Sequence, residues 1–544
     1  MWVEAVHSHS LFDKFRRALS IPLNLTFSPG RRNRTRNSPT RCHNVPMSIT
    51  SSPLLSELAE IVGDQYVIWR PEDLLVYEYD GSIDKATPQA VVLPRTAEEV
   101  SAIVRIANRH GEYIVARGAG TSLSGGAVAL RNSIVLALTR LTDLIEVDAE
   151  NRVAIVEPGM INLHLSEQVS HLGLFYAPDP ASQKTCTIGG NVGENAGGPH
   201  CLALGVTTNH VLGLEVVLAD GSLTWLGGSA RESTGYDLRG AFVGSEGTFG
   251  IITKVAVRLL PKPETIHSML AAFRTMDAAS QTVTEIIAAG MVPAALEMMD
   301  RKTIDAVEPF YHPGYPADAE AVLIVEVDGL KESVEEQTGL VLQICNDNGA
   351  MEIREADDEA TRAKLWETRK GAVGAYGAIA PTYYLVDGVV PRTKLREVLQ
   401  QVDQIAAELN VTVANVFHAG DGNIHPAILF DERHPEEVKQ AILAGERILE
   451  ACVAAGGALS GEHGIGIEKQ AYMPLVFTEN DLEAMARLRA AFIGEGDSED
   501  SPIGVPSLAE RFNPGKVFPG GAVHGEAYGI TASSFRPTGT SDWQ

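Results

Sequence analysis

The first half of the chain is a succession of short apolar runs separated by turns. Such runs, bounded by glycine and polar residues, are typical of buried strands. They occupy residues 91–93, 114–116, 133–138, 153–156 and 214–218. Between the first two runs, Thr96 and Glu99 form a capping box that begins a helix. The pattern predicts a strand–helix–strand unit followed by a β-rich region to about residue 260.

Beyond Pro261 and Pro263 the pattern changes to amphipathic helices that alternate with strands. We predict helices at residues 276–289, 394–408 and 435–455, and strands at residues 321–328, 383–390 and 412–418. Pro435 at the start of the last helix and Gly456 just past its end fit normal capping preferences. We therefore expect an α+β fold here, with helices covering one antiparallel sheet.

These patterns divide the chain into a leader (residues 1–46), a first domain (47–263), a second domain (264–520) and a polar tail (521–544). The leader carries eight Lys/Arg against two acidic residues. It is interpreted either as an organelle transit peptide or as a disordered extension ahead of a start at Met47. An acidic loop spans residues 494–507.

Composition excludes several classes of protein. The net charge of −26 argues against a nucleic-acid partner. The five cysteines are scattered and odd in number, so we expect a reducing compartment, with no disulfide framework or iron–sulfur cluster in this chain. No run approaches the ~18 apolar residues of a membrane span. We expect a cytoplasmic protein; membrane association through partners and organelle targeting by the leader stay open.

Two glycine-bounded segments concentrate histidine and carboxylate. His418 and His425 flank an Asp-Gly turn, which is a strong hairpin signal, so both imidazoles can face one spot. Glu462, in the second segment, can complete a three-ligand divalent-metal site and leave adjacent His463 as a free base. The alternative is a polar turn with two ordinary surface histidines.

Three glycine-rich segments in the first domain indicate a large ligand. Residues 117–126 follow a strand, and their free amide groups can hold a pyrophosphate. Residues 178–198 contain too much glycine for a packed core element, and residues 244–253 form a turn into a buried strand. Neither the dinucleotide fingerprint nor the P-loop matches. One segment alone would be a tight loop, but three favour a ligand.

Taken together, these segments resemble the FAD-linked 2-hydroxy-acid dehydrogenases of the vanillyl-alcohol-oxidase/p-cresol-methylhydroxylase superfamily, with the glycolate-oxidising members most similar. The resemblance spans roughly residues 50–520. It implies a two-subdomain FAD-binding domain of the p-cresol-methylhydroxylase type and an α+β substrate domain. Because the first glycine loop contains no histidine to tether the flavin, we expect FAD to be bound non-covalently.

The resemblance also implies which residues contact FAD. Around the pyrophosphate these are Arg117, Gly118, Ala119, Gly120, Thr121 and Ser122. Along the diphosphate and the flavin ring they are Pro178, Asp179, Ser182, Thr187, Gly189, Gly190, Asn191, Asn195 and Gly197. The adenosine half would be held by Glu246, Gly247, Ile251 and Ile252, and Asn513 would return to the flavin.

The implied reaction is oxidation of a small 2-hydroxy acid. A metal held by His418, His425 and Glu462 would bind the substrate hydroxyl; zinc suits this set, and manganese or iron(II) would also fit. His463 would take the proton. Arg369 would pair with the carboxylate through its guanidinium fork, unless it is a solvated helix charge.

Two positions bear on the size of the substrate. Leu385 and Ala427 lie near positions where 2-hydroxyglutarate enzymes of the family carry a lysine and an asparagine for the distal carboxylate. Neither can do this, so glycolate or D-lactate is favoured. One methyl group changes the binding free energy in a pocket by only roughly 1–3 kcal/mol, so the sequence does not decide between glycolate and D-lactate.

Electrons would leave to partner iron–sulfur and flavin subunits or to a quinone. Two competing hypotheses are a D-2-hydroxyglutarate dehydrogenase and a non-catalytic flavin subunit for electron transfer.

Overall fold

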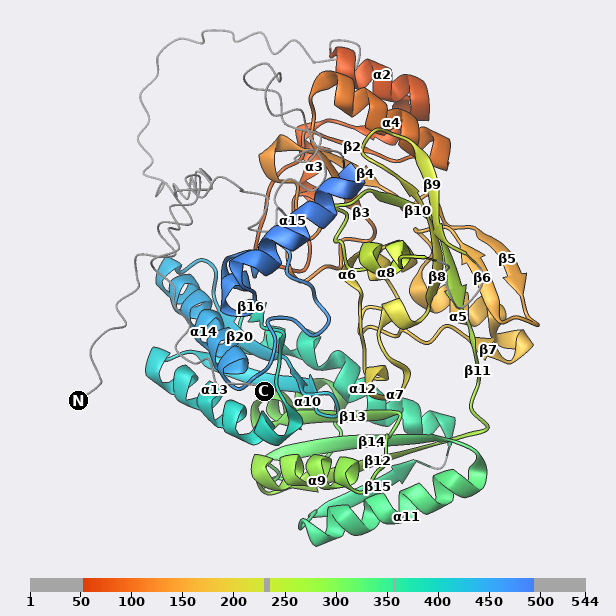
Figure 1. The fold of residues 1–544 in the computed structure, drawn as a ribbon. Helices are drawn as coiled ribbons and strands as arrows, with labels where there is room; N and C mark the ends of the chain where they lie inside the picture. The colour runs from red at the N-terminus through yellow and green to blue at the C-terminus, as the bar shows by residue number, and fades with distance from the viewer. Residues whose placement is uncertain (1–51, 229–234, 357, 494–544) are drawn as a thin grey trace, which may run out of the picture.

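The computed structural model describes residues 52–228, 235–356 and 358–493. The leader, the acidic loop, the polar tail and Asn513 lie outside the described residues. The chain forms two parts stacked one above the other in Figure 1, with the N-terminal half at the top. Within the described ranges, no helix has the length and apolar character needed to cross a membrane.

The first domain begins with a four-stranded sheet. Its order is β1 (Val67–Ile68), β2 (Ala90–Val92), β4 (Ile134–Ala137) and β3 (Ile114–Arg117). Strands β2, β4 and β3 run parallel, which requires a crossover, and α4 (Ala97–His110) supplies it between β2 and β3. The Thr96 hydroxyl caps α4 by accepting the Glu99 N–H. The predicted strand–helix–strand unit is confirmed. Helix α2 (Pro53–Val62) packs on α4.

A five-stranded antiparallel sheet follows. Its order is β5 (Leu144–Asp148), β6 (Val153–Val156), β10 (Ile251–Arg258), β8 (Val211–Val217) and β9 (Leu223–Gly227). Helices α5 (Asn162–Val169), α6 (Ile188–Glu194), α7 (Cys201–Leu204) and α8 (Leu238–Phe242) accompany it. The expectation that residues 178–198 hold no core element is wrong for α6. Thr187 caps this short helix, and its glycines lie on the face away from the core. The opposite face can therefore be apolar, and Ile188 and Val192 on it are fully buried in a hydrophobic core.

The second domain is built on a nine-stranded antiparallel sheet (Figure 1). One path runs β15 (Glu352–Ala356), β12 (Thr265–Phe273), β14 (Ala321–Gly329), β13 (Ala295–Asp300), β18 (Thr412–His418), β19 (Asn423–Ile424) and β17 (Gly388–Val389). Strand β20 (Pro426–Phe430) joins β18 to β16 (Thr382–Leu385). The expected α+β fold is confirmed.

Helices cover both faces of this sheet. One core contains residues of α9 (Met276–Ala288), α11 (Lys331–Asp347), α13 (Leu395–Leu409) and α14 (Pro435–Ala454). The other contains residues of α10 (Arg301–Tyr311) and α12 (Glu359–Ala375), which lie on the side facing the first domain. Helix α15 (Glu479–Ile493) then returns to the first domain, where Ile493 enters its core.

The predicted strand at residues 383–390 is wrong as a single element. The structure divides it into β16, which pairs with β20, and β17, which pairs with β19. Asp387 lies at the break and is fully buried. The break occurs because this carboxylate accepts hydrogen bonds from the loop at residues 460–463.

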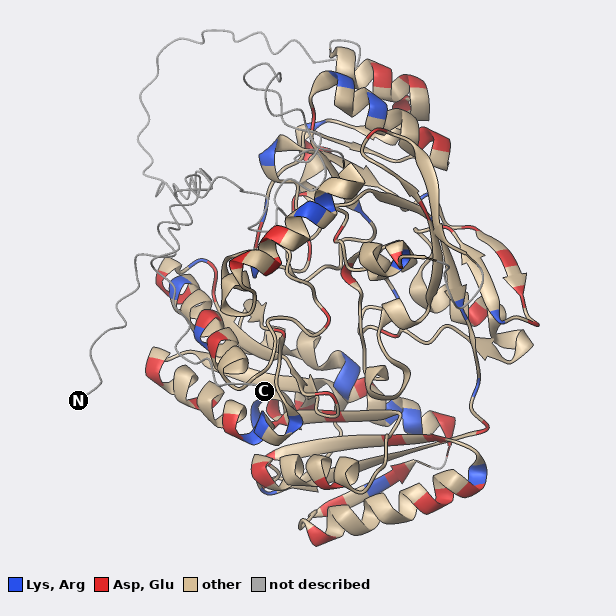
Figure 2. Cartoon of the chain, viewed as in Figure 1, with Lys and Arg blue, Asp and Glu red and all other residues tan. Residues whose placement is uncertain are grey.

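The outer surface of the second domain is acidic along α11. This helix carries Glu332, Glu335, Glu336 and Asp347 against Lys331 (Figure 2). A negative face of this kind repels the phosphates of a nucleic acid.

Candidate active site

The histidine hairpin forms as predicted. His418 at the end of β18 pairs with Asn423 of β19, and the chain continues to His425. The two imidazole rings lie edge to face with centroids 5.1 Å apart. Glu462 Oε1 lies 3.1 Å from His418 Nε2 and 3.2 Å from His425 Nε2. The alternative of two surface histidines is wrong, since both side chains are buried.

These three residues fit a divalent cation. Their ligand atoms all lie within 4.8 Å of one another. His425 Nε2 is buried and lacks a well-aligned hydrogen-bond partner, which is costly unless a ligand is bound. Burial disfavours the charged form of His418, but Glu297 and Glu462 outweigh burial and raise its pKa well above the usual range. The pocket thus attracts positive charge.

Glu297 of β13 was not foreseen from the sequence, yet it holds two predicted residues. Its Oε1 lies 2.6 Å from His418 Nδ1, and its Oε2 accepts from Arg369 Nε at 2.7 Å. The first contact fixes a proton on His418 Nδ1 and leaves Nε2 for a metal. Arg369 of α12 is 6% exposed, so the alternative of a solvated helix charge is wrong. The signal available was a lone glutamate inside an apolar strand.

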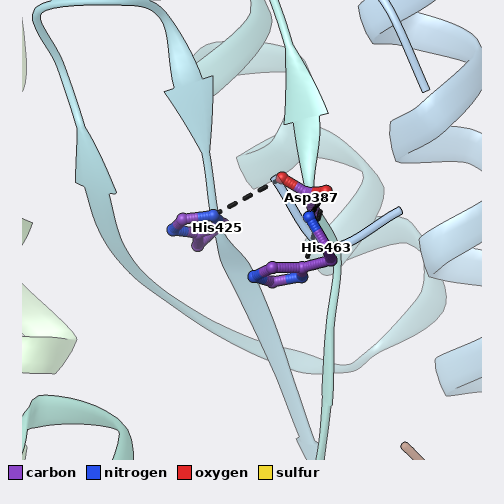
Figure 3. Close-up of side chains that lie close together, drawn as sticks. All are labelled: Asp387, His425 and His463. Atoms are coloured by element: carbon purple, nitrogen blue, oxygen red, sulfur yellow. Dashed lines mark hydrogen bonds and ion pairs between the residues drawn. The ribbon is translucent and has the colours of Figure 1, made fainter. Parts of the chain in front are cut away.

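Asp387, also missed, organises the loop that carries Glu462 and His463. It accepts the Ser460 hydroxyl at 2.6 Å and the His463 N–H at 2.9 Å. Figure 3 shows Asp387 beside the rings of His425 and His463, which stack with centroids 4.9 Å apart. Burial lowers the pKa of His463 to about 4, so the imidazole is neutral near pH 7 and has a free nitrogen lone pair, although the same shift makes it a weaker base than an exposed histidine.

Asp387, His425 and His463 form a second group with metal-ligand spacing. Lys469, fully buried, places Nζ 3.5 Å from Asp387 Oδ2 and already supplies positive charge there. A cation would be repelled by this ammonium group. The group of His418, His425 and Glu462 therefore suits a metal better.

The glycine-rich segments enclose a cavity of about 270 Å³. Its lining includes most of the predicted cofactor residues: Arg117, Gly118, Ala119, Gly120, Thr121, Ser122, Ser182, Thr187, Gly189, Gly190, Asn191, Gly197, Glu246, Gly247 and Ile252. Glu462 and His463 line the same cavity. The histidine cluster thus opens directly onto the glycine-lined space.

Close packing of the loops explains the glycines. A Cβ on Gly118 would lie 2.3 Å from Thr187 Oγ1, and one on Gly189 would lie 2.5 Å from Pro158 Cβ. Only glycine fits at these approaches, and it leaves backbone amides accessible to a phosphorylated ligand. The cradle suits the diphosphate of FAD.

The remaining predicted cofactor residues have other partners. The Pro178 carbonyl accepts from Asn162. Asp179 pairs with His200 at 2.7 Å. The Asn195 side chain accepts the Thr208 N–H, and Ile251 belongs to a hydrophobic core. In the described part of the chain, these four residues are not part of the cavity wall.

The fold and this cavity define a flavoprotein oxidoreductase, and comparison with known proteins agrees. Residues 88–227 match the FAD binding domain family, and residues 262–492 match the C-terminal domain of FAD linked oxidases. The chain is 44% identical over 449 residues to the glycolate oxidase subunit GlcD of Escherichia coli K12, covering 82% of this chain and 90% of that protein. It is 34% identical over 445 residues to a D-lactate dehydrogenase of Archaeoglobus fulgidus, covering 80% and 96%.

The structure of p-cresol methylhydroxylase with substrate bound matches with a TM-score of 0.68 and 17% identity, covering 81% of this chain and 94% of that one. This match shows the fold, as expected from the sequence. The chain belongs to the FAD-linked oxidase family and is an FAD-linked oxidoreductase.

Proposed function

We propose that the protein oxidises glycolate to glyoxylate. One observation carries the proposal: Glu462 and His463 line the glycine-rich cavity, while Glu462 also contacts His418 and His425. A flavin in that cavity and a metal on those side chains would reach the same substrate. The name and 44% identity of the Escherichia coli relative support glycolate over D-lactate, which is the second candidate.

The reaction removes a proton from the hydroxyl group and a hydride from Cα. FAD, when bound, supplies the hydride acceptor. A divalent metal, when bound by His418, His425 and Glu462, supplies a Lewis acid that lowers the pKa of the substrate hydroxyl. His463 accepts the proton at Nε2, the nitrogen that faces Glu462 at 3.9 Å. Asp387, on the Nδ1 side at 3.9 Å, stabilises the resulting imidazolium.

Arg369 would bind the substrate carboxylate. Glu297 occupies Nε and one N–H of Nη2, so the guanidinium still offers the outer edge formed by Nη1 and Nη2. That edge can form the bidentate pair with a carboxylate that the sequence predicted. Glu297 thereby fixes the orientation of a group that would otherwise be free to rotate.

We propose that apolar packing limits the size of the substrate. Leu385 of β16 and Ala427 of β20 are direct partners across the sheet, and both are buried in a cluster with Tyr376. A second carboxylate placed against this cluster would lose its hydration without gaining a counter-charge from these residues. The arrangement favours a small monocarboxylate over 2-hydroxyglutarate.

The reduced flavin must pass its electrons on. The Escherichia coli relative is named as a subunit of its oxidase. We propose that this chain likewise works with partner subunits that carry iron–sulfur clusters and a second flavin, or with a quinone. We also propose that the chain is cytoplasmic and that such partners bring it to a membrane.

The test is anaerobic titration of the purified flavoprotein with glycolate, D-lactate and D-2-hydroxyglutarate. The flavin absorbance should bleach with glycolate, and more quickly than with either of the other two acids. Bleaching only by 2-hydroxyglutarate would contradict the proposed substrate, and no bleaching by any of the three would favour a non-catalytic electron-transfer subunit.

A further inference from the structure

A carboxylate of the first domain anchors the loop that follows His463. Glu246 Oε1 accepts the Ile465 N–H at 2.8 Å, and Glu246 Oε2 accepts the Gly466 N–H at 2.9 Å. Glu246 is buried and lies more than 200 residues away from these donors in sequence. Each oxygen of the carboxylate thus holds one amide of the loop that carries the base.

Ser124, in the first glycine-rich segment, provides a second anchor. Its hydroxyl donates to the His463 carbonyl at 2.9 Å, and its own carbonyl accepts the Ile467 N–H at 3.0 Å. A Cβ on Gly466 would lie 1.9 Å from the Ser124 carbonyl oxygen. The two domains therefore meet here through backbone contacts that leave no space for a side chain.

The backbone of Glu246 adopts an uncommon conformation at this contact. Glu246 has φ +54°, in the left-handed region that favours glycine. A residue other than glycine persists there only when its surroundings require it. Its carboxylate also blocks space at the loop, since a Cβ on Gly464 would lie 2.9 Å from Glu246 Oε1.

We propose that Glu246 and Ser124 are positioning residues that hold His463 in register with the flavin-binding domain. This inference rests on the proposed function, in which His463 is the base. The base stands on one domain and the flavin cradle belongs to the other, so their relative placement depends on these contacts. A displacement of about 1 Å at a reacting group can cost on the order of 100-fold in rate.

The test uses Glu246→Gln in the full-length flavoprotein. The amide keeps one acceptor but turns an N–H toward a backbone N–H, so one anchor is lost. Amide hydrogen exchange in a peptide covering residues 462–468 should become faster. The rate of flavin reduction by saturating glycolate should fall at least about tenfold, while the Kd for glycolate stays within about twofold. FAD content should also stay within about twofold, because the loop amides hold both carboxylate oxygens in place of the adenosine contact that the resemblance implied for Glu246.

Ser124→Ala provides a second variant that removes only the hydroxyl anchor. It should change both measurements in the same direction, and less strongly. Glu99→Gln is the matched control, because Glu99 accepts the Arg95 N–H at 2.6 Å within the first domain and does not contact the loop. It should leave both measurements at wild-type values.

Wild-type exchange and reduction rates in Glu246→Gln would overturn the proposal. Loss of FAD from that variant would also overturn it, because Glu246 would then serve the cofactor. If the wild-type flavin is not reduced by any 2-hydroxy acid, the proposed function fails; unchanged exchange of the loop in Glu246→Gln would separately refute the anchor.

Discussion

At the scale of residues, the site depends on carboxylates that orient other groups. Glu297 joins Arg369 to His418, and Asp387 holds the loop of His463. Glu297, Arg369, Asp387 and His418 are buried, so each of these charges needs its partner. The proposed ligands and base are therefore placed before any substrate arrives.

Glu297→Gln should destabilise the protein and weaken metal binding. The substitution leaves the buried Arg369 charge without its counter-charge, which costs about 3–5 kcal/mol. The amide keeps one acceptor oxygen for two donors, so the contact with His418 Nδ1 is weakened or lost, which lowers metal affinity by up to roughly 10–100-fold. Urea unfolding and competition with a chelator measure the two effects.

Met299→Leu, two residues along the same strand, is the control. Equal stability and equal metal affinity in the two variants would contradict the assigned role of Glu297.

How far the sequence predicts the site depends on how local each contact is. His418 and His425 could be paired because the turn between them is a local signal. Glu297 could not be placed, because its pairing with His418 spans 121 residues and follows from the register of β13 against β18. The role of Arg369 as a carboxylate-binding residue could be predicted only from the family resemblance. Its hydrogen bond to Glu297 could be found only from the structure.

At the scale of elements, α12 is the helix that carries Arg369, and its position depends on α10. A Cβ on Gly371 would lie 1.9 Å from the Tyr311 hydroxyl of α10. In the same helix Gly374 has open space around its Cβ position. The contact between α12 and α10 therefore needs glycine at position 371 but not at position 374.

Gly371→Ala and Gly374→Ala should change stability in opposite directions. Alanine is favoured over glycine inside a helix by about 1 kcal/mol, so Gly374→Ala should stabilise. Gly371→Ala should destabilise, because the new methyl group forces α12 away from α10. Urea unfolding of both variants measures the difference. A Gly371→Ala protein as stable as Gly374→Ala would show that Tyr311 moves aside at no cost.

Most elements could be predicted because their patterns are strongly periodic, as α9 and α14 show. The strand at residues 383–390 could not be divided correctly, since its apolar pattern continues through Val386. The buried charge of Asp387 interrupts it for a reason that lies in the distant loop at residues 460–463.

At the scale of the whole molecule, the site exists only because two domains meet. His200 of the first domain joins them by pairing with Asp179 and with Glu326 of β14, at 2.7 and 3.1 Å. Glu326 also accepts from Trp366 of α12, at 2.8 Å. This contact therefore connects the cofactor loop to the helix that carries Arg369.

Stability should fall at alkaline pH through His200. Burial opposes its charge, but Asp179 and Glu326 raise its pKa well above the usual value. The folded protein therefore holds this proton more tightly than the unfolded chain. The stabilisation of the folded state by protonated His200 is complete below about pH 6.5, the pKa of histidine in the unfolded chain. It is lost as the pH rises through the higher pKa that His200 has in the folded protein.

Melting temperature measured from about pH 6 to about pH 10 should show this loss in the wild type. His200→Asn should reduce the slope, since asparagine keeps a hydrogen bond but does not titrate. If the melting temperature of His200→Asn falls with pH as steeply as that of the wild type, groups other than His200 cause the loss of stability.

The central claim is that the histidine–glutamate cluster and the flavin act on one substrate. Stopped-flow reduction of the flavin by glycolate, before and after removal of bound metal with a chelator, tests it most directly. Metal-free protein should retain FAD but reduce it at least about 100-fold more slowly, because a Lewis acid contributes several kcal/mol to the transition state. Adding Zn²⁺ or Mn²⁺ should restore the rate. Metal-free protein that reduces its flavin at the full rate would contradict the account.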